Sequence, residues 1–115
     1  MIKRNINALA IILSIFCMNA TASVGMPSYQ VPENVGIYPD GTLEVIFPVV
    51  FNSGCTNGDG KRMFIKVGNS QAVTEESFKY IKSVVLTALT AQKRIKFWYD
   101  RIDTTCEGGK INIVP

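Results

Sequence analysis

Two cysteines, Cys55 and Cys106, constrain the fold of this chain most, because the chain also begins with the pattern of an export signal. Cysteines of exported proteins are usually oxidised, and two cysteines allow a single intramolecular disulfide. Such a bridge would close a loop of about fifty residues, which contributes on the order of 4 kcal/mol in the chain-entropy model. We therefore expect a small domain closed by one disulfide between Cys55 and Cys106. Two free or intermolecular thiols are the alternative.

The export signal is predicted over residues 1–22. A basic start precedes an apolar run from Ala8 to Met18, and small residues then favour cleavage after Ala22. The run of about eleven residues is shorter than the roughly twenty that a membrane-spanning helix needs. A buried N-terminal helix is the alternative, and lipoprotein processing at Cys17 is disfavoured because the bulky Phe16 precedes it. We expect a bacterial protein, periplasmic or secreted, without a membrane anchor.

Removal of the signal changes the length and the charge of the chain. Of 115 residues, 93 remain after the loss of residues 1–22, which is enough for one small domain. The net charge falls from +3 to +1 because Lys3 and Arg4 are lost. A clustered basic surface for nucleic acid is therefore not predicted. We expect residues 23–34, which contain Gly25, Pro27 and Pro32, to form an extended N-terminal arm or a frayed terminus, and residues 35–115 to form the domain.

The apolar pattern of the domain predicts five strands and one helix. Thr74 is the expected N-cap of the helix, with Glu75 and Glu76 favourably placed in its first turn. Pro48 should lie at a strand edge or a bulge. Polar loops over residues 52–61 and 101–109 carry the two cysteines. The expected strands are Val35–Tyr38, Thr42–Phe51, Met63–Val67, Arg94–Asp100 and Lys110–Val114, and the expected helix is Glu75–Gln92.

This order of elements, β-β-β-α-β-β, predicts a mainly β fold. It matches the OB-fold, a five-stranded, partly open barrel in which the helix would plug the open end of the barrel. The predicted disulfide would then tie the loop after the second strand to the loop before the last. An α+β roll, with the helix on one face of a sheet, is the alternative.

Three runs of the sequence resemble a known family. They are GCTNGDGKRMFIKVGN, SFKYIKSVVLTALTAQKRIKFWYD and CEGGKINIV, and they are similar to the B subunit of subtilase cytotoxin and its relatives among small exported bacterial proteins. The likeness covers about Val35 to Val114, but Ala91-Gln92-Lys93 stands where relatives often carry Gly-Lys. The resemblance implies an OB-fold and, as function, a pentameric glycan-binding subunit of an AB5 toxin. It identifies no sugar-contacting residue in this chain.

Catalysis is not predicted from the residues. The chain has no histidine, and both cysteines of the domain are assigned to the bridge. Asn57-Gly58-Asp59-Gly60 is typical of a turn and lacks the later glutamate of a calcium loop. Asp100 and Asp103 are expected to be solvated in a loop. We therefore expect a non-enzymatic protein without metal or cofactor.

Trp98, Lys96 and Asp100 are the candidate ligand-binding residues. Because side chains alternate along a strand, Trp98 should face outward between Lys96 and Asp100 if Phe97 and Tyr99 face the core. An exposed Trp with polar neighbours can stack on a sugar ring or anchor a protein interface. The alternative is that Trp98 packs under the N-terminal arm or the edge of the helix.

Two classes of function follow. The first is an exported binding module that recognises a glycan or an exported A-type subunit, and that can form a homo-oligomer. The second is a periplasmic inhibitor or immunity-type protein that blocks an enzyme through the loop at residues 52–62. Binding of single-stranded nucleic acid is disfavoured by export and by the low net charge, although Arg94, Lys96 and Trp98 share a strand face.

Overall fold

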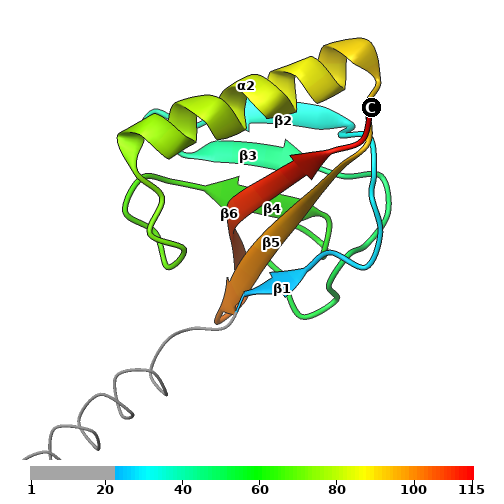
Figure 1. Ribbon diagram of the computed structural model, residues 1–115. Coiled ribbons are helices and arrows are strands. Elements are labelled where there is room, and N and C mark those ends of the chain that lie inside the picture. Colours follow the sequence, from blue (N-terminus) through cyan, green and yellow to red (C-terminus); the bar gives the residue numbers. More distant parts are fainter. Residues whose placement is uncertain (1–22) are drawn as a thin grey trace, which may run out of the picture.

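The computed structural model describes residues 23–115 as a six-stranded mixed sheet with one helix (Figure 1). The predicted export signal and Cys17 lie outside the described residues. The strand order is β1-β5-β6-β4-β3-β2, and neighbours are antiparallel except for the parallel pair β4 and β6. The elements are β1 (Val24–Gly25), β2 (Asn34–Ile37), β3 (Leu43–Ile46), β4 (Arg62–Ile65), α2 (Glu75–Ala91), β5 (Ile95–Ile102) and β6 (Thr105–Ile113).

The structure confirms a mainly β fold with one helix and one disulfide, and the predicted β-β-β-α-β-β order corresponds to β2, β3, β4, α2, β5 and β6. The sheet is not closed into a barrel. Its two edges are β2 and the short β1, which sequence analysis did not predict as a strand. No helix within residues 23–115 is long and apolar enough to cross a membrane.

The N-terminal arm is extended and runs from one edge of the sheet towards the other. The Met26 amide donates to the Phe97 carbonyl at 2.9 Å, and Gln30 exchanges two backbone hydrogen bonds with Ile95. The Glu33 amide then donates to the Ile46 carbonyl of β3. The side chain of Met26 is buried. The arm is therefore a packed part of the fold rather than a frayed terminus.

Helix α2 begins at a capping box. The Thr74 hydroxyl accepts from the Ser77 amide at 3.1 Å, and the Ser77 hydroxyl accepts from the Thr74 amide at 2.9 Å. The structure thus confirms Thr74 as N-cap. Ile81, Val85 and Ala88 recur at helical spacing and are buried, which directs this stripe of α2 against the sheet.

The core lies between α2 and the inner face of the sheet. Leu43 and Val45 on β3 alternate with outward residues, as do Met63 and Ile65 on β4. A set of aromatic rings in edge contact fills the other end of the core, with centroids 5.3–6.2 Å apart: Phe47, Phe51, Phe97 and Tyr99.

Two predicted boundaries are wrong. The strand expected to run to Phe51 ends at Ile46, because the chain bends away at Pro48, which is exposed. The loop expected over residues 101–109 is instead the tip of a hairpin in which β5 and β6 continue to Ile102 and from Thr105. Cys106 therefore lies in β6 and not in a loop.

Candidate functional site

The outer face of the sheet, opposite α2, carries the main hollow of the described residues. Phe64 and Lys66 point outward at the end of β4, because they alternate with Met63 and Ile65, which face the core. Beside them, the parallel register places Phe64 opposite Glu107 of β6. The hollow has a volume of about 490 Å³ and is lined by Thr42, Phe64, Lys66, Gly68, Asn69, Ser70, Ile102, Thr105 and Glu107.

One wall of the hollow is the loop that joins β4 to α2. The Ser70 amide donates to Oε1 of Glu107 at 3.0 Å, and Nδ2 of Asn69 donates to the Gly108 carbonyl at 3.0 Å. Within the loop, Oδ1 of Asn69 accepts from the Gln71 amide at 3.0 Å. These bonds fix the loop to β6, so the wall is held in place by contacts distant in sequence.

The lining combines an apolar platform with polar groups. The ring of Phe64 is half-buried and Ile102 is exposed, so both offer apolar surface. Around them, Thr42 and Thr105 carry hydroxyl groups, and Glu107 carries a carboxylate with one oxygen used by Ser70. An aromatic face with convergent hydrogen-bonding groups is the usual chemistry of a small-ligand site. Sequence analysis did not find this hollow.

A polar network borders the hollow on β3. The carboxylate of Glu44, nearly buried, accepts from the Tyr38 hydroxyl at 2.7 Å and from Arg62 at 3.2 Å. The hydrogen bond to this carboxylate, and then desolvation, raise the pKa of Tyr38. The Tyr38 ring also lies 6.3 Å from the ring of Phe64. The network therefore orients aromatic surface next to the hollow.

Trp98 and Lys96, two of the predicted binding residues, lie together on β5. Both side chains are half-buried, and Nζ of Lys96 is 5.0 Å from the centre of the Trp98 ring. Lys110, directly opposite Trp98 on β6, places its Nζ 4.6 Å from the same ring. Gly25 of β1 pairs with Trp98, so the N-terminal arm packs beside the ring. This contact corresponds to the alternative in which Trp98 packs against the arm.

Asp100 is more deeply buried than Lys96 and Trp98. The expectation that it is solvated in a loop is wrong. It lies in β5 with only 3% of its surface exposed, and its carboxylate accepts from Nε2 of Gln71 at 2.6 Å. β5 continues past Asp100 to Ile102, so Asp100 is paired with Glu107 of β6 instead of lying in a loop. The Gln71 side chain lies over Gly109 and covers this part of the sheet.

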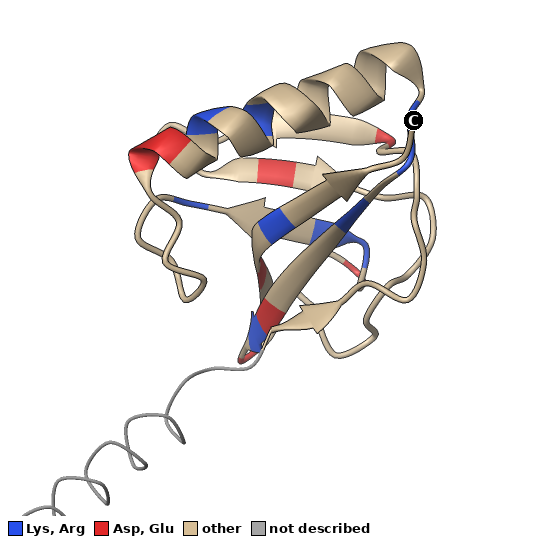
Figure 2. Ribbon diagram, viewed as in Figure 1, with Lys and Arg blue, Asp and Glu red and all other residues tan. Residues whose placement is uncertain are grey.

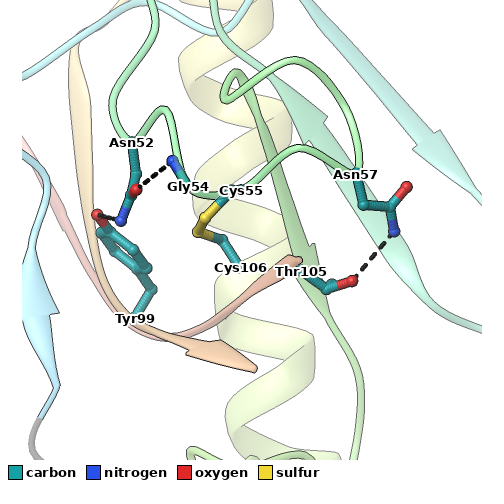
Figure 3. Close-up of a disulfide and its surroundings, with 7 residues drawn as sticks. All are labelled: Asn52, Gly54, Cys55, Asn57, Tyr99, Thr105 and Cys106. Carbon is teal, nitrogen blue, oxygen red and sulfur yellow. Dashed lines mark hydrogen bonds between the residues drawn. A yellow bond between two sulfur atoms is a disulfide. The ribbon is translucent and has the colours of Figure 1, made fainter. Parts of the chain in front are cut away.

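The disulfide links Cys55 to Cys106 across 51 residues of sequence, with Cα atoms 5.6 Å apart (Figure 3). The loop that carries Cys55 is also held by side chains on both sides of the bridge. Nδ2 of Asn52 donates to the Tyr99 hydroxyl at 3.0 Å, and Nδ2 of Asn57 donates to the Thr105 hydroxyl at 3.1 Å (Figure 3). The loop is thus a rigid attachment to the tip of the β5–β6 hairpin.

Gly60 shows why this loop needs its glycines. Its φ of +71° lies in the left-handed region, and a Cβ at this position would stand 2.6 Å from the Asn52 carbonyl oxygen. Within the part of the chain that is described, no group of three or more His, Cys, Asp or Glu side chains could hold a metal ion. The Gly60 amide donates to the Cys55 carbonyl at 2.9 Å, so the turn at residues 57–60 helps to position Cys55.

Comparison with known proteins does not assign the chain to a family. No protein-family model matches the sequence, and a search of curated proteins gives no match.

Proposed function

We propose that this chain is an exported, non-enzymatic binding protein that recognises a glycan in the hollow beside Phe64 and Glu107. The observation that carries this proposal is the position of the hollow. OB-folds bind oligosaccharides and oligonucleotides on the face of their second and third strands, between the loops that follow strands one and four. The second and third strands of the predicted order correspond to β3 and β4. The hollow is lined by Thr42, which precedes β3, and by Ile102 and Thr105, which flank the turn between β5 and β6.

The chemistry of the lining favours a sugar over a nucleic acid. A pyranose ring presents an apolar C–H face, which can stack on Phe64, and hydroxyl groups at its rim. The carboxylate of Glu107 accepts hydrogen bonds from hydroxyl groups, whereas it repels a phosphate backbone. Lys66 is one cation at the hollow, fewer than phosphate tracking needs.

A homo-oligomer belongs to the same proposal. All charged residues of α2 lie in its first half, and no charged residue occurs between Ser83 and Ala91 (Figure 2). On this uncharged half Leu86 is 45% exposed, and it lines a shallow groove with Ser83 and Thr87. An outward helix face without charges fits burial against a second copy of the chain. The resemblance to the B subunit of subtilase cytotoxin supports both parts of the proposal.

A glycan array probed with the oxidised protein tests recognition, and native mass spectrometry tests assembly. The proposal expects a defined set of bound glycans and a closed oligomer. Phe64→Ala should weaken the array signal markedly. Tyr80→Ala is the matched control, since it removes an aromatic ring that is 66% exposed on α2, away from the hollow. A silent array from a folded, oxidised protein contradicts glycan recognition.

A second candidate is an inhibitor that acts through the disulfide-linked loop. Val49 and Val50 are 61% and 44% exposed just before this loop, which is fixed to the β5–β6 hairpin by the disulfide and by Asn57. A rigid loop flanked by apolar side chains can enter a partner's cleft at little entropic cost. Under this reading, Val49→Asp would abolish capture of an exported enzyme, while Phe64→Ala would leave it unchanged.

A further inference from the structure

Besides the hollow, the outer face of the sheet holds a compact group of two cations around one indole ring. Trp98 on β5 lies opposite Lys110 on β6, and Lys96 is two residues before Trp98 on the same face of β5. Their Nζ atoms are 5.0 Å and 4.6 Å from the centre of the Trp98 ring. In Figure 2 the blue segments of β5 and β6 lie on these neighbouring strands.

The two ammonium groups are held close together. Because each lies within 5.0 Å of the same ring centre, they are separated by no more than about 10 Å, about one Debye length at roughly 0.1 M salt. Lys96 is further oriented by Tyr29, whose ring centre is 5.7 Å from Nζ of Lys96. Cation–π contact with the rings steers both charges to one side of the sheet.

Neither charge is neutralised by the protein. Within residues 23–115 the salt bridge found is that of Arg62 with Glu44, so no carboxylate lies within 4.0 Å of Nζ of Lys96 or Lys110. The acidic residues nearest in sequence are Asp100 to Lys96 and Glu107 to Lys110, and they accept hydrogen bonds from Gln71 and from the Ser70 amide. Two converging lysines without an acidic partner form a local positive potential that a dianion can satisfy.

Gly25 allows β1 to pack closely beside the group. A Cβ at this position would lie 3.0 Å from Cε of Lys96 and 3.1 Å from Nε1 of Trp98, so a larger residue would press on both side chains. The two ammonium groups are positively charged donors, and the oxygens of a phosphate group are strong acceptors that carry a charge of about −1.5 to −2 at neutral pH. Charge-assisted hydrogen bonds therefore favour a phosphate over a neutral sugar at this pair of lysines.

We propose that Trp98, Lys96 and Lys110 form a phosphate-binding site, separate from the hollow beside Phe64. The ligand is a phosphate group, carried either by a lipid headgroup or by a small soluble molecule. The site binds the phosphate through charge and hydrogen bonds alone, and no covalent bond is formed or broken.

Trp98 is the only tryptophan of the chain, so its fluorescence reports directly on this site. The oxidised protein is titrated with inorganic phosphate, with vesicles of phosphatidylglycerol in phosphatidylcholine, and with sodium chloride at matched ionic strength. The proposal expects a saturable change with phosphate or with the anionic vesicles, and no such change with chloride or with phosphatidylcholine alone. A response to vesicles without a response to phosphate identifies a lipid headgroup, and the reverse identifies a soluble ligand.

Variants locate the response. Lys96→Met and Lys110→Met should each raise the apparent Kd about fivefold, the effect of losing one partly exposed charge contact. Lys82→Met is the matched control, since it removes the same charge and a comparable contact, with Phe78 on α2. Glu107→Gln, which alters the hollow, should leave the phosphate response unchanged. The proposal is overturned if chloride reproduces the phosphate response, or if Lys82→Met weakens it as much as Lys96→Met and Lys110→Met do.

Discussion

Removal of the disulfide by the double substitution Cys55→Ala and Cys106→Ala should cost the domain much of its stability. The bridge closes a loop of 51 residues, for which the chain-entropy model gives about 4 kcal/mol. A domain of this size has a net stability of about 5–14 kcal/mol. Both cysteines are fully buried, so truncation also leaves unfilled space beside the core.

A loss of about 4 kcal/mol corresponds to a fall in Tm of about 15–30 °C for a domain of fewer than 100 residues. Thermal unfolding followed by circular dichroism measures this fall, and wild-type protein with reductant should show the same shift. Ser53→Ala, an exposed change in the same loop, is the control and should move Tm by only a few degrees. A double variant that melts within about 5 °C of the wild type would refute the reasoning.

Three further predictions concern the arm, the helix and the hollow's border. Gln30→Ala removes a buried side chain that exchanges two hydrogen bonds with the Val49 backbone. It should lower the free energy of unfolding, measured in urea, by about 1–3 kcal/mol. An unchanged free energy would mean that the arm does not stabilise the fold. Thr74→Ala removes the N-cap and should cost about 1 kcal/mol in the same assay, whereas an unchanged midpoint would show that the capping box is dispensable. The pKa of Tyr38 is raised by its hydrogen bond to Glu44, so this bond stabilises the fold below the ordinary tyrosine pKa and is lost as pH rises through the raised value. Tyr38→Phe should therefore be less stable than wild type near neutral pH and equally stable in strong alkali; a pH-independent difference would contradict the assignment.

The sequence was sufficient for features that depend on local pattern. The spacing of Ile81, Val85 and Ala88 and the polar Thr74 before them predict the helix and its start, because a helix is specified by contacts three and four residues apart. The pairing of Cys55 with Cys106 was predicted by counting the two cysteines that follow the predicted export signal. These predictions required no knowledge of which strands are neighbours.

Features that depend on long-range contacts were not predictable. The hollow exists because β4 pairs in parallel with β6 and because Ser70 and Asn69 attach their loop to β6, about forty residues later. Asp100 was misplaced for a related reason, since the cover provided by Gln71, 29 residues away, leaves no local trace in the sequence. Trp98 and Lys96 were predicted to share a face of one strand because side chains alternate along a strand, and their role in binding stays a prediction.

The central claim is that a glycan stacks on Phe64 in the outer hollow, and isothermal titration of a glycan selected on the array tests it most directly. Wild type, Phe64→Ala and Tyr80→Ala would be compared with that glycan. The account predicts that Phe64→Ala raises Kd about tenfold, the effect of losing one aromatic stacking contact, and that Tyr80→Ala leaves Kd unchanged. Equal affinities for wild type and a folded Phe64→Ala would contradict it.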